Sequence, residues 1–391
     1  MSNENKIVIL APSLNTGGIS KVINSYYRMF CNNKVECNIV LTDNILTDRS
    51  ENIPLSKITT LGFKTSKYYK KNFFDLFRNI LLLPLSVGKL TRRNEKTIIC
   101  VHFLPIFIGI LLKFFKPSLN CLFVYHTNVF TYSQGKSKLV SFLYEKFIWV
   151  SQIGDSVVFL TEDVTNEFNK KTGLGKAVTI PNCYERICCI EKKDYAEHCF
   201  NILFAGRLSK EKNIDFILSV FESLKNKYPN EHMKLLIAGD GPLKAELIEI
   251  KNKMKHGNFV DFLGYCPDMK DIYSCADVMC LASSIEGFPV SLLEALDFKL
   301  PVVSSNCASG PSSIIGFGKN IKPNDSYVHE TPVGFLLPVP TGDNSNAEIV
   351  SYVDAISKVF DKRFNYCTTF SNEIIEAFEQ RKIFRKWESI I

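Results

Sequence analysis

Short apolar runs rich in β-branched residues recur along this chain, and stretches of helical periodicity separate them. A first series comprises residues 6–11, 35–41, 97–102, 121–126 and 155–160, and a second comprises 201–205, 233–238, 259–262, 277–281 and 301–304. Such runs are typical of strands that are buried on both faces of a parallel sheet, with helices as the crossovers. Because the alternation stops and restarts, the sequence predicts two successive α/β domains, each a parallel sheet with helices on both faces.

The expected domain boundary lies where this periodicity fails, between residues 181 and 200. We therefore predict one domain over 1–182 and a second over 183–370. After Thr341 the pattern is helical only, and residues 371–391 keep apolar positions at helical spacing. We expect a C-terminal helix there whose apolar stripe packs on another surface of the protein.

The charge of the chain is unevenly distributed. The 47 basic and 40 acidic residues leave a net charge of +7. Between Lys57 and Lys138, however, 14 basic residues face only two acidic ones, a local net of +12. Such a block calls for an anionic partner, which could be nucleic acid, a membrane surface or a phosphorylated substrate.

Cysteine spacing and hydropathy indicate a cytoplasmic location. The 13 cysteines form no CxxC or zinc-type pattern, so we expect free thiols in a reducing compartment. The polar first residues lead directly into a strand, without the pattern of a secretory signal. Residues 73–85 and 103–115 fall short of the roughly 20 apolar residues that cross a membrane. We expect both as core-facing helices in a protein that is soluble or peripherally attached.

Candidate ligand-binding residues of the first series follow its strands, at the sheet edge where α/β folds bind ligands. Gly17 and Gly18 would let a phosphate or a sugar approach the next helix, although an ordinary turn explains the pair equally well. They do not form the GxGxxG of dinucleotide-binding proteins. His126 ends its strand, where a ligand contact and a structural role are both open.

In the second series, a loop opened by Gly206 carries Arg207 and Lys212 ahead of a helix. Two cations and the amides of a helix N-terminus can converge there on one diphosphate. Solvated surface cations are the alternative interpretation.

The segment SSIEGFPVSLLEALDF carries the strongest signal. Glu286 lies in the loop after strand 277–281, and Glu294 lies eight residues later. The helix between them begins near Val290 and Ser291, and its amides favour an anion. Because carboxylates accept hydrogen bonds from vicinal hydroxyls, this spacing suits a diphosphate flanked by a ribose and a hexose. The alternative is a surface helix with two solvated acids.

Taken in order, these residues resemble glycosyltransferase family 4, retaining nucleotide-sugar transferases of the GT-B architecture with two facing Rossmann-like domains. The resemblance runs through GGIS, the strand-end His126, VTIPN, AGRLSKEKN, IAGDGP, VDFLGY, the E-x7-E element and VGFLLPV. It implies that the helix over 371–391 crosses back to the first domain. The segment SNCASGPSSII is similar to a subgroup that assembles bacterial surface polysaccharides, although Ser313 stands where that subgroup often has Glu.

The resemblance also implies roles for individual residues. Arg207 and Lys212 would bind the donor diphosphate and stabilise the leaving nucleotide, and Glu286 would contact the transferred sugar. The other implied contacts are Gly287 and Phe288 at that sugar, His126 at the same sugar, Gly206, Val290 and Ser291 at the diphosphate, Glu294 at the ribose, Gly264 and Tyr265 beside the base, and Gly17 and Gly18 at the diphosphate and acceptor.

The function expected on this basis is retaining transfer of a hexose or N-acetylhexosamine to a glycan acceptor on a polyprenyl or lipid carrier, in the synthesis of O-antigen, capsule or a similar polysaccharide. A UDP-sugar is favoured as the donor. No DxD motif stands at a strand end, so we expect no cofactor and no required metal. One alternative is a nucleotide-sugar epimerase of the same architecture. Another is a nucleic-acid-binding protein that uses the basic 57–138 block, although no helix-turn-helix, RNP or zinc signature accompanies it.

The basic block fits a membrane-bound acceptor better than it fits nucleic acid. Each Lys or Arg near an anionic leaflet contributes about 1 kcal/mol of attraction. We therefore expect peripheral association with the inner face of the membrane. The amphipathic stretch 72–90 could add apolar insertion, or it could be a core helix.

Overall fold

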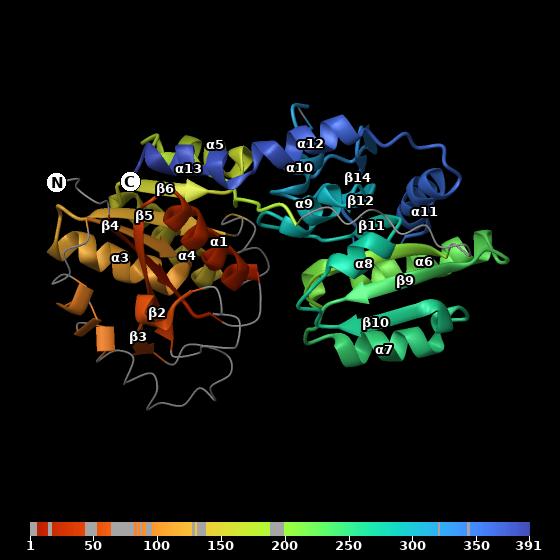
Figure 1. Ribbon diagram of the computed structural model, residues 1–391, viewed down its shortest axis with the longest axis horizontal. Coiled ribbons are helices and arrows are strands. Elements are labelled where there is room, and N and C mark those ends of the chain that lie inside the picture. The colour runs from red at the N-terminus through yellow and green to blue at the C-terminus, as the bar shows by residue number, and fades with distance from the viewer. Residues whose placement is uncertain are drawn as a thin grey trace. The chain divides into compact units, whose positions relative to one another are not determined.

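The computed structural model describes residues 6–14, 18–43, 53–63, 82–83, 85–86, 88–90, 96–126, 130, 138–187, 199–319, 321–341 and 345–391. The chain divides into two compact units (Figure 1). Unit 1 comprises Met1–Cys183 together with Gln380–Ile391, and unit 2 comprises Tyr184–Glu379. The chain therefore passes between the units twice.

Unit 1 contains a seven-stranded sheet in the order β3-β2-β1-β4-β5-β6-β7, and all its strand pairs are parallel. Its strands are β1 (Lys6–Ala11), β2 (Glu36–Asp43), β3 (Ile58–Phe63), β4 (Thr97–Val101), β5 (Asn120–Tyr125), β6 (Ser156–Phe159) and β7 (Ala177–Thr179). All five residues of β4 are buried, as expected for a strand covered on both faces.

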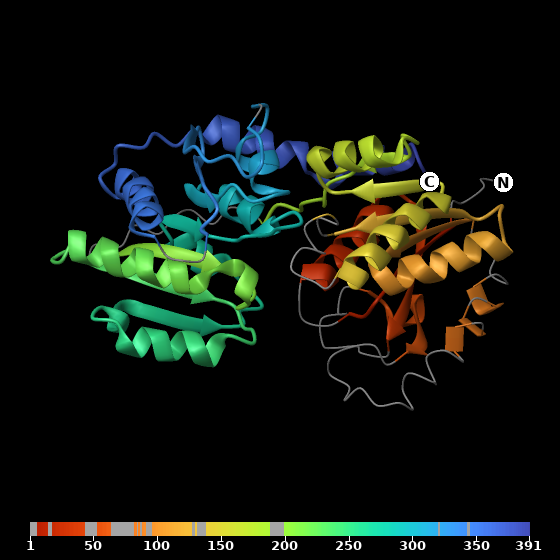
Figure 2. The same ribbon diagram turned by 180° about the vertical axis from the view of Figure 1, so that it is seen from behind.

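The helices of unit 1 lie on both faces of this sheet. They are α1 (Gly18–Asn32), α3 (Phe103–Phe115), α4 (Lys138–Val150), α5 (Glu162–Thr172) and α13 (Gln380–Glu388), with 3-10 turns η2 (Leu55–Lys57) and η3 (Ser151–Ile153). The strands connected through α3 and α4 follow one another in one direction across the sheet, so right-handed crossovers put both helices on the same face. Figure 2 shows α3 and α4 together on that side.

Unit 2 contains a second seven-stranded sheet in the order β10-β9-β8-β11-β12-β14-β13. Its strands are β8 (Phe200–Ala205), β9 (Met233–Ala238), β10 (Val260–Gly264), β11 (Val278–Leu281), β12 (Val302–Ser305), β13 (His329–Thr331) and β14 (Gly334–Leu337). Six strands are parallel, and β13 pairs antiparallel with β14 at the edge. The predicted two parallel-sheet α/β domains are thus confirmed, and the antiparallel edge is an addition.

The helices of unit 2 alternate with its strands as far as β12 and then form a C-terminal group. They are α6 (Ile214–Lys227), α7 (Lys244–Lys253), α8 (Lys270–Cys275), α9 (Val290–Asp297), α10 (Pro311–Ile315), α11 (Asn346–Phe360) and α12 (Thr368–Ala377), with 3-10 turns η4 (Lys210–Lys212) and η5 (Gly257–Phe259). All ten strands expected from the sequence lie in the two sheets.

The C-terminal helix predicted over 371–391 is instead two helices, α12 and α13, separated at Phe378 and Glu379. The Phe378 carbonyl accepts a hydrogen bond from the Tyr184 amide at 2.7 Å, and Glu379 pairs with Tyr184 in a parallel bridge. The bond to Tyr184 takes the place of a helical bond at Phe378, which explains the break. Beyond it, Trp387 of α13 packs edge-on against Tyr26 of α1, so the apolar stripe is received by unit 1.

Of the stretch 72–90, only residues 82–83, 85–86 and 88–90 are described. Leu82 and Leu83 pack against the core of unit 1, and Leu90 is buried within it. Residues 72–81, which include most of the predicted amphipathic face, lie outside the described residues. No helix among the described residues is both long enough and apolar enough to cross a bilayer.

Candidate functional site

The second sheet has a topological switch point between β8 and β11. From β8 the chain continues to β9 on one side of the sheet, whereas from β11 it continues to β12 on the other. In open α/β sheets, ligands bind at the carboxyl ends of the strands at such a point. The loops that follow β8 and β11 carry Arg207, Lys212 and Glu286, so three predicted site residues lie at this position.

An ion pair joins the two loops. Lys212 Nζ donates to Glu286 Oε1 at 2.6 Å, with side-chain exposures of 19% and 9%. The Ser283 hydroxyl donates to the same carboxylate oxygen at 2.7 Å. A carboxylate with so little exposure needs such partners because its charge has lost most of its hydration.

Backbone contacts hold the two loops in register. The amide of Ser284 donates to the carbonyl of Glu211 at 2.8 Å, and Asn213 Nδ2 donates to the Ala282 carbonyl at 2.9 Å. Asn213 has a φ of 47°, in the left-handed region, and it directly precedes α6. Lys212 and Glu286 are therefore positioned by their loops as well as by each other.

The two predicted cations differ in their surroundings. Arg207 is exposed, while Lys212 is half-buried beside Glu286. Between them, the Ser209 hydroxyl donates to Glu211 Oε1 at 2.6 Å. The loop thus offers one cation to solvent and one cation that already has a carboxylate partner.

Glycines bring the ends of β8, β9 and β10 together. The Gly206 amide donates to the Ala238 carbonyl at 3.0 Å, and the Gly239 amide donates to the Gly264 carbonyl at 2.7 Å. Gly239 has a φ of 148°, and a Cβ there would overlap the carbonyl oxygen of Gly206. Beyond Gly264 at this edge, Tyr265 exposes 45% of its surface, as a residue available to a ligand must.

The loop before α9 packs against the loop that follows β12. Gly287 is half-buried and Phe288 is buried, and a Cβ on Gly310 would overlap the ring of Pro289. The loop after β12 therefore lies directly against this segment. Val290 and Ser291 follow in the first turn of α9, both half-buried.

Glu294 lies in α9, half-buried, and accepts a hydrogen bond from Tyr273 of α8. The Tyr273 hydroxyl lies 2.7 Å from Glu294 Oε2. Burial, followed by the neighbouring Glu294 charge, raises the pKa of Tyr273, so this phenol remains a donor at neutral pH. Tyr273 therefore fixes the orientation of Glu294, the residue predicted to contact the ribose.

In unit 1, the predicted residues lie after β1 and β5. Gly17 lies outside the described residues, and Gly18 is the first residue of α1. His126 directly follows β5, and its Nε2 is buried without a hydrogen-bond partner among the residues described. Burial, and then the charge of His102, lower the pKa of His126 to about 3, so the ring is neutral.

His102 was not singled out in the sequence as a site residue. It lies between β4 and α3 with a φ of 76°, a conformation that costs a non-glycine residue free energy. Burial lowers its pKa, as it does for His126. Its place after β4 was readable from the sequence, because it ends its strand as His126 does. Tyr273 and Ser283 gave no such signal, since each acts only through a carboxylate that the fold brings to it.

In the described part of the chain, no three His, Cys, Asp or Glu side chains gather as metal ligands would.

Comparison with known proteins identifies the region that contains this site. Residues 191–329 match the family model described as glycosyl transferases group 1. That range includes the loops after β8 and β11, with Arg207, Lys212, Glu286 and Glu294.

Two relatives extend the likeness. An amylovoran biosynthesis glycosyltransferase of Erwinia amylovora is 25% identical over 315 residues, which cover 79% of this chain and 83% of that protein. An alpha-1,4-N-acetyl-D-galactosaminyltransferase of Campylobacter jejuni is 41% identical over 114 residues, 29% of this chain and 31% of that protein. The name of the second relative includes a PP-undecaprenol-linked glycan.

Among solved structures, the pneumococcal O-GlcNAc transferase GtfA in complex with UDP and GlcNAc is similar in fold. Its TM-score is 0.74, the identity is 16%, and the match covers 99% of this chain and 98% of that one. At this level of identity the likeness shows the two-domain fold.

Proposed function

Because this chain is a glycosyltransferase that carries a glycosyl transferases group 1 domain, we propose that it moves a sugar from a nucleoside diphosphate to a glycan. The transferred sugar is a hexose or an N-acetylhexosamine, the donor is a UDP-sugar, and the anomeric configuration is retained. The acceptor is a growing surface polysaccharide on a lipid carrier. Known relatives include a bacterial polysaccharide glycosyltransferase, which supports this class of acceptor.

The observation that carries the proposal is the Lys212–Glu286 pair at the switch point of the second sheet. Both hydrogen bonds to the Glu286 carboxylate described above end on Oε1. Glu286 can therefore accept from a sugar hydroxyl through Oε2 while Lys212 reaches a phosphate oxygen with another of its three donors. Such a pair would set a sugar contact directly beside a phosphate contact, which supports a nucleoside diphosphate sugar as the donor.

The leaving diphosphate would gain its stabilisation from Arg207, Lys212 and the amides at Val290 and Ser291. These donors are held in place before the reaction, so they stabilise the charge that develops on the leaving group. We propose that this arrangement needs no metal and no other cofactor. Chelation with EDTA should therefore leave the rate unchanged.

Residues around the diphosphate complete the donor contacts. Glu294, oriented by Tyr273, would accept from the ribose hydroxyls. Gly264 and the exposed Tyr265 would lie beside the base, and Gly206, Gly287 and Phe288 would offer backbone contacts. For unit 1 we propose the roles that the family resemblance implies, with His126 at the donor sugar and Gly17 and Gly18 at the diphosphate and acceptor.

The lipid carrier is supported by the Campylobacter relative, whose name includes PP-undecaprenol. The basic excess between residues 57 and 138 supports it as well, because a polyprenyl diphosphate is an anion held at a membrane. We therefore propose that the protein works at the inner face of the membrane.

A donor screen tests the proposal. Thermal stabilisation and slow hydrolysis are measured across UDP- and GDP-sugars, with the anomeric configuration of the product followed by NMR. We expect one UDP-sugar to stabilise the protein and to release its sugar with retention. Release of a free epimerised nucleotide sugar, or inversion at the anomeric carbon, would contradict the proposal.

Lys212→Met and Lys210→Met form a matched pair for the same assay. Both residues lie in η4, but Lys210 is exposed and has no carboxylate partner in the described contacts. We expect Lys212→Met to lower turnover about 10²–10³-fold, the cost of removing one preorganised donor, and Lys210→Met to leave it nearly unchanged. Equal turnover in the two variants would remove Lys212 from the mechanism.

A further inference from the structure

The helices α3 and α4 of unit 1 present aromatic side chains to solvent. On α4, the exposed positions Phe142, Glu145, Lys146, Trp149 and Val150 recur at helical spacing, so they form one stripe. A solvent-facing stripe of a helix is normally polar. Here it is mostly apolar, and Ile153 of the adjoining η3 turn continues it.

The outer side of α3 has the same character. Its buried residues include Ile106, Ile108 and Leu112, which face the sheet, whereas Phe107, Phe114 and Phe115 are exposed. Phe114 exposes 72% of its surface and Phe115 exposes 66%. The sequence predicts α3 as a core-facing helix, and the structure shows that only one side of it is.

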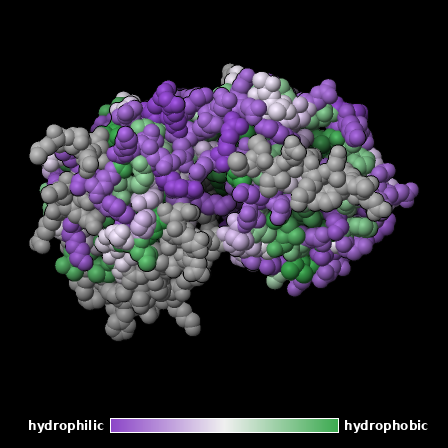
Figure 3. All heavy atoms as spheres, viewed as in Figure 1, coloured by the Kyte–Doolittle hydropathy of each residue, from purple (hydrophilic) through white to green (hydrophobic). Residues whose placement is uncertain are grey.

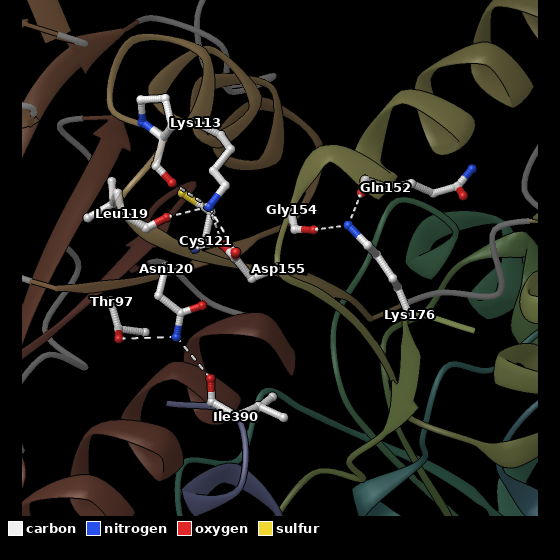
Figure 4. Close-up of polar contacts among 11 residues, drawn as sticks. Thr97, Lys113, Leu119, Asn120, Cys121, Gln152, Gly154, Asp155, Lys176 and Ile390 are labelled. Atoms are coloured by element: carbon white, nitrogen blue, oxygen red, sulfur yellow. Dashed lines mark hydrogen bonds and ion pairs between the residues drawn. The ribbon is translucent and has the colours of Figure 1, made fainter. Parts of the chain in front are cut away.

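A clamp of polar contacts between Lys113 and Asp155 links the two helices that carry these side chains (Figure 4). Lys113, which directly precedes Phe114, donates to both carboxylate oxygens of Asp155 at 2.8 Å. Asp155 lies two residues after Ile153, and its Oδ2 also accepts from the Cys121 amide of β5. The end of α3 and the end of α4 are therefore tied to each other and to the sheet.

Lys113 also donates to the carbonyls of Pro117 and Leu119, at 2.8 and 3.0 Å. Its charge is thus consumed by the clamp and is not offered to a partner. Together with the ring contacts of Phe103 with Tyr144 and Phe147, the clamp fixes α3 against α4. We call the resulting surface the α3/α4 aromatic face, comprising Phe107, Phe114, Phe115, Phe142, Trp149 and Ile153.

Contiguous exposed apolar side chains are rare on the surface of a monomeric soluble protein. On the face drawn in Figure 3, hydrophilic residues predominate and hydrophobic residues occur in small groups. Large contiguous apolar patches on soluble proteins mark an interaction site. The α3/α4 aromatic face has the composition of such a site.

The charges around the face indicate which occupant. Lys146 lies on the α4 stripe with its ammonium group 5.3 Å from the Phe142 ring centroid, and Lys116 follows Phe115. Glu145 is the acid on the same stripe. The face also lies within or beside the segment 57–138, which carries the local net charge of +12. Exposed aromatic side chains carried by or next to a basic segment of the sequence are the composition that binds the interface of an anionic bilayer.

We propose that the α3/α4 aromatic face docks on an anionic lipid bilayer, with Phe114, Phe115 and Trp149 inserted at the level of the headgroups. The role of this docking rests on the proposed function, because docking would hold the enzyme at the membrane where a lipid-carried acceptor lies. The docking itself needs neither donor nor acceptor. It can therefore succeed or fail independently of the reaction.

The two tryptophans give a direct readout. Trp149 is 62% exposed, whereas Trp387 is buried against α1. A blue shift of the emission on adding vesicles of phosphatidylcholine and phosphatidylglycerol, and quenching by brominated lipid, would therefore report on Trp149. We expect both with mixed vesicles and neither with phosphatidylcholine alone. An unchanged emission with mixed vesicles at low salt would overturn the proposal.

Co-sedimentation of the full chain with the same vesicles tests the named residues. The variant Phe114→Ser/Phe115→Ser/Trp149→Ser should bind at least about tenfold more weakly, since its apolar insertion is removed. The matched control Tyr327→Ser/Val328→Ser/Val350→Ser replaces three exposed apolar residues of unit 2 and should bind like the unchanged protein.

Three outcomes would count against the bilayer. Equal binding by the two triple variants would show that other residues carry it. A monomer mass found only in the Phe114/Phe115/Trp149 variant would make a second copy of the chain the occupant. A large drop in melting temperature in that variant alone would mean that the chain itself covers the face. Thermal stabilisation by UDP-sugars, measured in parallel, reports separately on the proposed function.

Discussion

The Lys212–Glu286 pair predicts that the two cations of the β8 loop differ in their effect on stability. Lys212→Met removes the partner of a carboxylate that is only 9% exposed. Arg207→Met removes an exposed guanidinium from the same loop. From the sequence alone, the two residues are equivalent phosphate ligands. A difference between the stabilities of the two variants therefore tests the geometry of the site.

The magnitude follows from the contact. At an effective dielectric constant of about 20, unit charges 2.6 Å apart attract by about 6 kcal/mol. Desolvation of the two ions offsets most of this, but removing only the cation leaves the carboxylate uncompensated, at a typical cost of about 3–5 kcal/mol. The remaining Ser283 hydroxyl and the partial exposure of Lys212 reduce the cost. We expect Lys212→Met to lower the free energy of unfolding by about 2–3 kcal/mol.

Urea unfolding followed by circular dichroism measures this loss. Arg207→Met should change the free energy of unfolding by less than about 0.5 kcal/mol, as exposed substitutions usually do. The double variant Lys212→Met/Glu286→Gln should regain stability relative to Lys212→Met, because no buried charge remains. If Lys212→Met unfolds at the same urea concentration as Arg207→Met, Lys212 and Glu286 do not form a stabilising buried ion pair.

Three further predictions concern other residues. His126 stays neutral in the folded protein, with a pKa of about 3, and takes up a proton on unfolding below about pH 6.5, so stability should fall on acidification by up to about 1.4 kcal/mol per pH unit. His126→Asn should flatten that slope in urea titrations at pH 7 and pH 5, and an unchanged slope would refute the assignment. Gly239→Ala should cost at least twice the roughly 1 kcal/mol expected for Gly175→Ala, since only the former overlaps backbone; equal melting temperatures would contradict this. Tyr273→Phe should raise KM for the donor several-fold with kcat nearly unchanged, because it frees Glu294, and a loss confined to kcat would disagree.

The fold was largely predictable because its main signal is repeated ten times. Strands buried on both faces must be apolar at every position, so runs such as 97–102 and 233–238 identify themselves. Four strands in the described part of the chain were not predicted. Strands β3, β7 and β13 lie at sheet edges and have exposed or half-buried residues, so packing imposes less on their sequences. Strand β14 was missed although all four of its residues are buried.

The candidate site was predictable only as far as its residues stand at strand ends. Arg207, Lys212 and Glu286 follow strands and could be found by that rule. Their pairing could not, because it depends on how the loops after β8 and β11 approach each other across the switch point. Tyr273 also has no local signature, since its role exists only through the carboxylate of Glu294.

The α3/α4 aromatic face shows why an apolar helix should not be assigned to a core from composition alone. The segment 103–115 is apolar nearly throughout, and a chain with a sheet to cover can use only one side of such a helix. Ile106 and Leu112 satisfy that need. The aromatic residues Phe107, Phe114 and Phe115 on the other side serve no packing that the sheet requires. Lys113, which carries the one charge within α3, is turned inward onto Asp155 rather than outward to solvent. With its one charge held in the clamp and its phenylalanines exposed, α3 offers an apolar side to a partner, and this is the basis for the docking on an anionic bilayer that we propose.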